Sequence, residues 1–149
     1  MQISSTRLLQ FSQQFKKFYA HQFLPLLKES GLSMREMDVL LFLANNPNFD
    51  TARDITEFRG LSKSQVSQAV DLLAAEGLLL RTPDTDDRRV VHLSVTPEGM
   101  PLARKAQSVQ TACGDQLFAG LTPEQEQLLH TALETVLVNA SRLAEEATL

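Results

Sequence analysis

The chain has 149 residues, of which 43% are hydrophobic and 21% charged, enough to bury one hydrophobic core in a soluble domain. Its formal net charge is −4, and six acids but only one base lie in residues 106–149. No apolar run approaches the roughly 20 residues of a membrane helix, and the N-terminus has no signal-peptide pattern, so we expect a cytoplasmic protein without membrane contact. The single cysteine, Cys113, excludes an intrachain disulfide and favours a buried apolar role.

The first 45 residues predict two helices. Leu8–Leu27 carries leucine and phenylalanine at helical spacing, and we expect Pro25 and then Gly31 to interrupt this helix. A serine and a glutamate at positions 33 and 36 have the spacing of a capping box. They predict a second helix from about Met34 to Asn45.

Two short helices and a hairpin are predicted next. The helices are Ala52–Phe58 and Lys63–Glu76, with a glycine turn between them and a second capping box at the start of the latter. Leu78–Thr82 and Val90–Val95 are rich in apolar and β-branched residues and flank a charged, turn-forming segment. They predict a two-stranded hairpin with a polar tip.

The remainder of the chain predicts two long helices. Thr96, followed by proline and glutamate, is typical of a helix start, and this helix should run to about Phe118. A similar start at Thr122 opens the final helix, whose apolar stripe consists of Leu129, Leu133, Val136, Ala140 and Leu143.

The order helix, turn, capped helix, hairpin is that of a winged helix-turn-helix, whose second helix lies in the DNA major groove. The candidate DNA-binding residues of this helix are Ser62, Lys63, Ser64, Gln65, Ser67 and Gln68. Glutamine can pair with an adenine edge, serine lets the helix approach closely, and Lys63 suits a phosphate contact. Judged by its polarity alone, this helix face is more typical of an ordinary solvent-exposed helix. The hairpin that directly follows the helix favours the alternative, a face that reads DNA.

The candidate DNA-binding residues of the hairpin are Asp87, Arg88 and Arg89. Asp87 and Arg89 are two residues apart, so on an extended strand they point the same way and the carboxylate can orient the guanidinium. An arginine held in this manner suits a narrow minor groove. The alternative is a surface salt bridge of little energetic consequence.

The run Asp87–Gly99 resembles the wing signature of the MarR family of bacterial transcriptional regulators, and Leu61–Ser67 is similar to that family's recognition helix. The resemblance implies a mainly α fold with a small β wing. It implies a winged helix-turn-helix at 34–99 and a helical dimerisation region built from 1–33 and 100–149. Two departures remove positive charge from the DNA face: Gln68 stands where many relatives have arginine, and Leu72 replaces another frequent basic residue.

The apolar stripes of the first and last helices exceed what a small winged domain can cover, so we expect a homodimer, although the two helices packing on each other in a monomer is the alternative. The resemblance also implies a pocket for a small aromatic or phenolic effector. Its candidate residues are Phe11, Phe15, Phe18, Tyr19, His21 and Phe42, although aromatic side chains at this spacing are more often core.

His21, His92 and His130 lie on separate predicted elements, so no metal site is expected, and no catalytic or cofactor-binding motif is present. We therefore expect no enzyme and no cofactor. The function predicted is a ligand-responsive repressor that binds a pseudo-palindromic duplex operator as a homodimer. The alternative is a winged-helix protein-interaction module that no longer binds DNA.

Overall fold

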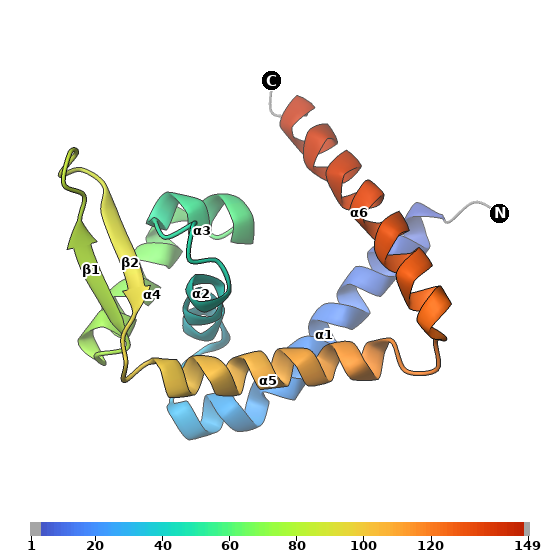
Figure 1. Ribbon diagram of the computed structural model, residues 1–149, viewed down its shortest axis with the longest axis horizontal. Coiled ribbons are helices and arrows are strands. Elements are labelled where there is room, and N and C mark those ends of the chain that lie inside the picture. Colours follow the sequence, from blue (N-terminus) through green and yellow to red (C-terminus); the bar gives the residue numbers. More distant parts are fainter. Residues whose placement is uncertain (1–3, 148–149) are drawn as a thin grey trace. The chain divides into compact units, whose positions relative to one another are not determined.

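Helices dominate the computed structural model, which describes residues 4–147 (Figure 1). In chain order the elements are α1 (Ser5–Ser30), α2 (Met34–Asn45), α3 (Ala52–Arg59), α4 (Lys63–Ala75), β1 (Leu79–Pro83), β2 (Val91–Val95), α5 (Met100–Leu117) and α6 (Pro123–Glu146). The expected mainly α fold with a small β wing is confirmed. By packing, the chain divides into two compact units, Met1–Cys113 and Gly114–Leu149.

The helix starts follow local capping chemistry. The side chain of Ser33 accepts a hydrogen bond from the amide of Glu36, whose carboxylate in turn accepts from the amide of Ser33. Equivalent boxes open α3 at Thr51, α4 at Ser62 and α6 at Thr122. Each box satisfies backbone donors that the first helical turn leaves free. The predicted bounds of α2 are therefore confirmed at both ends, and those of α3 and α4 to within one residue.

The expected interruption of α1 at Pro25 is wrong. The helix continues through Pro25 to Ser30, and Gly31 alone ends it with a φ of 73°. Phe23 and Leu26 on either side of the proline are buried, and their burial offsets the backbone hydrogen bond that proline cannot make. The carbonyl thus left free belongs to His21, whose exposed position lets water bind it.

The start of α5 also differs from the prediction. A turn spans residues 97–99, and the helix proper begins at Met100. Thr96 still acts as the cap, because its hydroxyl accepts from the amide of Gly99 at 3.0 Å and donates to the carbonyl of Gly77 at 2.6 Å. Glycine is required at position 99 because a side chain there would collide with the carbonyl of Leu78. This turn therefore joins the hairpin tightly to α5.

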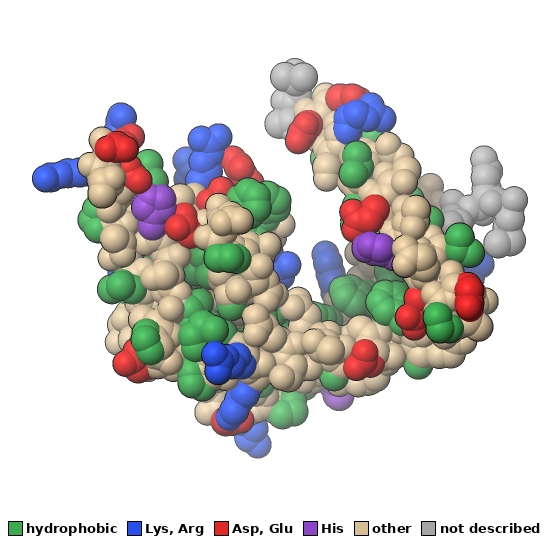
Figure 2. All heavy atoms as spheres, in the orientation of Figure 1, with side chains coloured by type: hydrophobic (Ala, Val, Ile, Leu, Met, Phe, Trp, Pro, Cys, Tyr) green, Lys and Arg blue, Asp and Glu red, His purple; other side chains and the backbone are tan. Residues whose placement is uncertain are grey.

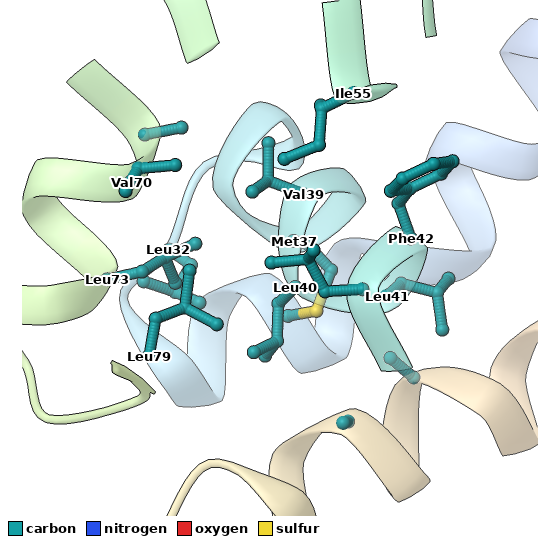
Figure 3. Close-up of a cluster of buried hydrophobic side chains, with 14 of the residues drawn as sticks. Leu32, Met37, Val39, Leu40, Leu41, Phe42, Ile55, Val70, Leu73 and Leu79 are labelled. Atoms are coloured by element: carbon teal, nitrogen blue, oxygen red, sulfur yellow. The ribbon is translucent and has the colours of Figure 1, made fainter. Parts of the chain in front are cut away.

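The core of the first unit is centred on α2 (Figure 3). Met37, Val39 and Leu40 of this helix are wholly buried, and they meet Ile55 of α3 and Leu73 of α4. Full burial of side chains of this size stabilises a fold by about 1.5–3 kcal/mol each. The helix-turn-helix is therefore supported by a rigid apolar centre.

The wing is one antiparallel pair of strands. Leu79 pairs with Val95 and Pro83 with Val91, and residues 84–90 connect the two strands. Leu79 and Leu93 are buried on the inner face. The amide of Leu93 also donates to the carbonyl of Asp50 at 2.7 Å, which ties β2 to the segment that precedes α3. Both strands begin one residue later than predicted.

The second unit comprises the last turn of α5, a turn at Gly120 with a φ of 90°, and α6. No residue of α6 between Pro123 and Glu146 is buried, and Leu128 and Val138 are more than half exposed. A hollow of about 470 Å³ in this unit is lined partly by Phe118, Leu129 and Leu133. Within residues 4–147, no helix combines the length and apolar character needed to cross a membrane.

Candidate nucleic-acid interface

Helix α4 presents a polar face to solvent. Lys63, Ser64, Ser67 and Gln68 are exposed, whereas Val66, Ala69, Val70 and Leu73 are buried in the core. The other two predicted residues form the helix cap: the hydroxyl of Ser62 accepts from the amide of Gln65 at 3.1 Å, and the Gln65 side-chain oxygen accepts from the amide of Ser62 at 3.0 Å. The cap fixes the orientation of the Gln65 side chain and leaves its amide NH₂ and the Ser62 O–H as donors for an external partner.

The wing tip contains Asp87, Arg88 and Arg89. One carboxylate oxygen of Asp87 accepts from the backbone amide of Arg89 at 3.0 Å and from its Nε at 3.1 Å. The other oxygen accepts from Nη2 at 3.3 Å. The guanidinium is thus held in two places while the Arg89 side chain remains 91% exposed. These hydrogen bonds also lower the pKa of Asp87 below its ordinary value.

The pairing of Asp87 with Arg89 was expected, but its predicted backbone was wrong. The two residues lie in a turn closed by a hydrogen bond from the amide of Val90 to the carbonyl of Asp87 at 2.9 Å, and not on an extended strand. The turn also brings the backbone amide of Arg89 to the carboxylate, which strand alternation would not do. The result is a more constrained arginine than the spacing alone predicted.

A cluster that the sequence analysis missed lies at the base of the wing tip. His92 Nδ1 is 2.8 Å from Asp50 Oδ1, and His92 Nε2 is 2.8 Å from Asp84 Oδ1. The hydrogen bonds with Asp50 and Asp84 raise the pKa of His92. The hydrogen bond between Asp84 and His92 is also the main cause that lowers the pKa of Asp84 to about 2. The hairpin register places Thr82 opposite His92, and Asp84 follows two residues later on the same side of the hairpin, so this contact has a local signal. Asp50 is 42 residues from His92 and has none.

A hollow of about 710 Å³ lies between α3, α4 and the wing strands, with Lys63 and Ser67 of α4 on its wall. Its lining also includes Arg53, Thr56 and Arg81. Arg81 pairs with Asp71, and Arg53 pairs with Glu57 at 2.8 Å. The basic groups of this hollow are therefore largely neutralised by acids of the same chain.

The face of the winged region in Figure 2 agrees with this charge balance. Basic, acidic and histidine side chains gather around the end of the hairpin, and no continuous basic field covers the visible part of α3 and the strands. Positive charge is local here, in a chain whose formal net charge is −4.

The six residues predicted for an effector pocket are not all brought together. Phe11, Phe15 and Tyr19 form one row of ring contacts along α1, with centroids 6.1 and 5.7 Å apart. Phe42 instead packs against Phe58, and His21 is exposed. Phe18 is half-buried, and the two hollows described above are lined by other residues. Assignment of an effector to these residues stays a prediction.

Tyr19 is the polar member of this row. Its hydroxyl accepts a hydrogen bond from the Gln110 side chain of α5 at 3.3 Å, and burial raises its pKa. Gln110 in turn accepts from Asn45 of α2 at 3.0 Å. These bonds join α1, α2 and α5 through neutral polar groups.

The described residues contain no group of three histidine, cysteine or acidic side chains arranged to hold a metal ion. Cys113 is buried, and burial raises the pKa of its thiol, which disfavours the reactive thiolate. The site therefore offers hydrogen-bonding and charged groups for recognition.

A winged helix-turn-helix with an exposed polar second helix and an arginine at its wing tip is the architecture of a DNA-binding transcriptional regulator. Residues 30–90 match the family model described as MarR family. A crystal structure of a MarR-family transcriptional regulator from Silicibacter pomeroyi superposes with a TM-score of 0.75 at 26% identity, covering 87% of this chain and 86% of that one. The winged region of this chain is therefore similar to that of MarR-family regulators.

Two further relatives bear on regulation. The homoprotocatechuate degradative operon repressor of Escherichia coli is 26% identical over 121 residues, which is 80% of this chain and 81% of that protein. Bordetella bronchiseptica BpsR, whose structure concerns regulation of DNA binding by 6-hydroxynicotinic acid, has a TM-score of 0.67 at 20% identity. That comparison covers 87% of this chain and 98% of BpsR. The first relative is named as an operon repressor, and the second is described by its regulated DNA binding.

Proposed function

We propose that this protein is a homodimeric repressor that reads a pseudo-palindromic duplex with α4 and the wing, and that releases it when a small aromatic effector binds. The observation that carries the proposal is the Arg89 guanidinium, held by Asp87 yet 91% exposed at the wing tip. A side chain that is already oriented loses little conformational freedom when it binds.

On α4, we assign different exposed residues to the phosphate backbone and to the base edges of DNA. Lys63 and the free amides of the first turn suit phosphate oxygens, which position the helix without reading sequence. Ser64 and Ser67 are small enough to admit the helix into the major groove, and Gln68 offers both a donor and an acceptor to an adenine edge. Because Gln65 uses its oxygen in the cap, we assign base reading chiefly to Gln68.

At the wing, Arg89 is assigned to the minor groove, where narrow A·T tracts concentrate negative potential. Arg88 is also exposed and suits the flanking phosphates. Arg89 is paired with an acid, as Arg53 and Arg81 are, so the assignment rests on its position at the wing tip and its 91% exposure.

The proposal is tested with a duplex recovered by the wild-type protein from a randomised pool. Arg89→Ala should weaken binding of that duplex by about ten-fold or more and reduce the slope of log affinity against log salt by about one. Asp87→Asn keeps the arginine but loosens its orientation, and should have a smaller effect. Arg35→Ala, which removes the same charge from the exposed surface of α2, is the matched control and should stay within about two-fold.

Fluorescence anisotropy at several salt concentrations measures all four proteins. Equal binding by wild type and Arg89→Ala would show that the wing does not read DNA. A wild-type protein that recovers no duplex at low salt would instead favour the protein-interaction module.

Dimerisation is supported by the apolar surface of the second unit. Leu129, Leu133 and Val136 of the predicted stripe are all exposed at 40% or more, as are Leu8 and Phe11 of α1. Apolar stripes of this length are normally covered by a second chain. We assign dimerisation to residues 1–33 and 100–149, and DNA contact to 34–99.

Response to an effector is supported by the names of two relatives. Homoprotocatechuate and 6-hydroxynicotinic acid are both aromatic acids. We propose that an aromatic acid binds near the ring row of α1, with Tyr19 as its polar contact. A panel of aromatic acids titrated into the protein–DNA complex should include one that releases the duplex, and Tyr19→Phe should weaken that release without altering DNA affinity in its absence.

A further inference from the structure

We propose that His92 is a positioning residue for DNA binding, which in its protonated form clamps the wing tip to the segment before α3. The inference rests on the proposed role of the wing in reading DNA. It predicts that DNA affinity falls as pH rises through the titration of this one side chain.

The geometry of the ring requires the charged form. His92 contacts Asp50 through Nδ1 and Asp84 through Nε2, each at 2.8 Å. A neutral imidazole carries only one N–H, so one of these contacts would then place a nitrogen lone pair against a carboxylate oxygen. Only the imidazolium can donate to both aspartates at once. Loss of the proton therefore breaks one side of the clamp.

Asp84 connects the contact with His92 to the turn that holds Arg89. Its second oxygen accepts from the backbone amides of Asp86 at 3.0 Å and Asp87 at 2.9 Å, which shapes the turn that presents Asp87 to Arg89. At the other end, Asp50 belongs to the segment that also binds the amide of Leu93. The clamp thus connects the helix-turn-helix to the part of the wing that we assign to the minor groove.

Among residues 4–147, Asp50 and Asp84 are the charged groups that contact the ring. Thr82, opposite His92 in the hairpin, is neutral. The nearby ions are paired among themselves, namely Asp87 with Arg89, Arg53 with Glu57 and Arg81 with Asp71. Asp50 and Asp84 are therefore the groups that set the protonation of His92, and both favour the cation.

The pH window follows from the two shifts. The pKa of His92 is raised above its ordinary 6.5, so its contribution is complete below 6.5 and is lost as pH rises through the raised value. The pKa of Asp84 is lowered from 3.8 to about 2, so its contribution is complete above 3.8 and is lost as pH falls through about 2. The clamp is therefore intact from mildly acidic pH up to 6.5.

The experiment measures affinity for the recovered duplex from about pH 6 to about pH 9, the range in which histidine titrates. The wild type should lose about two- to five-fold in affinity across this range, the effect of one partly exposed ion pair. His92→Gln should bind at the weaker level at every pH. Asp50→Asn should bind at the stronger level at every pH, because its amide donates to Nδ1 of a neutral ring that still donates to Asp84.

The Asp50→Asn variant separates positioning from a general effect of charge, since it removes the pH dependence while keeping the histidine. A wild-type pH profile in either variant overturns the inference. If the wild type binds no duplex at any pH, the proposed function fails instead. The clamp is then still tested by amide hydrogen exchange at Asp86 and Asp87, which should quicken beyond the intrinsic effect of pH in wild type but not in Asp50→Asn.

Discussion

Individual side chains on α4 leave the recognition surface almost neutral. Ser64, Ser67 and Gln68 carry no charge, and Asp71 is paired with Arg81. Leu72 is 39% exposed and lies one helical turn beyond Gln68, so it occupies the same face of the helix. An apolar side chain here adds nothing to phosphate binding, so we expect this position to limit affinity for DNA.

Leu72→Arg should therefore strengthen binding. A guanidinium one turn beyond Gln68 reaches the phosphate backbone and should raise affinity by about three- to ten-fold while steepening the salt slope by about one. Anisotropy titrations at several salt concentrations measure both quantities. Leu72→Gln, which removes the apolar group without adding charge, is the control; an equal gain in both variants would attribute the effect to lost hydrophobicity.

At the scale of elements, local chemistry made the helix starts predictable and packing made other features unpredictable. The capping boxes at Ser33 and Ser62 need only four consecutive residues, and the predicted starts of α2 and α4 are correct. The continuation of α1 through Pro25 depends on burial of its neighbours, which no local pattern reveals. The contact between His92 and Asp50 likewise exists only after the wing has packed beside α3.

The candidate site divides in the same manner. The exposed residues of α4 were predictable because helical periodicity separates them from Val66 and Leu73. The bond between Asp87 and Arg89 was predictable from their spacing, but the turn that closes on Val90 was not. Arg53 lines the hollow only because α3 and the wing meet there.

The cap of α4 serves both stability and recognition, which a pair of variants can separate. Ser62→Ala removes the acceptor of the Gln65 amide and should lower the free energy of unfolding by about 1 kcal/mol. It should also weaken DNA binding, because the first turn that carries Lys63 and Ser64 frays. Urea unfolding and anisotropy titration measure the two effects.

Ser33→Ala is the matched control, since it breaks a capping box of the same type, closed by Glu36 in place of Gln65, at the start of α2. We expect a similar loss of stability with DNA affinity unchanged. A loss of affinity as large as that of Ser62→Ala would indicate that both variants act only through global stability.

At the scale of the whole molecule, the exposed apolar stripe of α6 favours pairing of two chains, and the exposed face of α4 favours contact with DNA. A single winged domain contacts one half-site, whereas two domains held by a common interface read two half-sites about one DNA turn apart. A chain with few free positive charges at its reading face gains most from this arrangement, because the second half-site adds contacts without a second loss of rotational and translational freedom. We therefore propose that dimerisation and DNA specificity are linked in this protein.

This link is testable at Val136, which is 54% exposed on α6 and does not line the hollow of the second unit. Val136→Glu places a charge in the proposed interface and should convert the dimer to a monomer, because an unpaired carboxylate is costly to bury. Gln127→Glu adds the same charge about two and a half helical turns away, on the opposite face, and should remain dimeric. Sedimentation velocity distinguishes the two states. The Val136→Glu variant should also lose far more affinity for a duplex with two half-sites than for a duplex with one. If the monomer instead binds both duplexes as the wild type does, the two winged regions act independently.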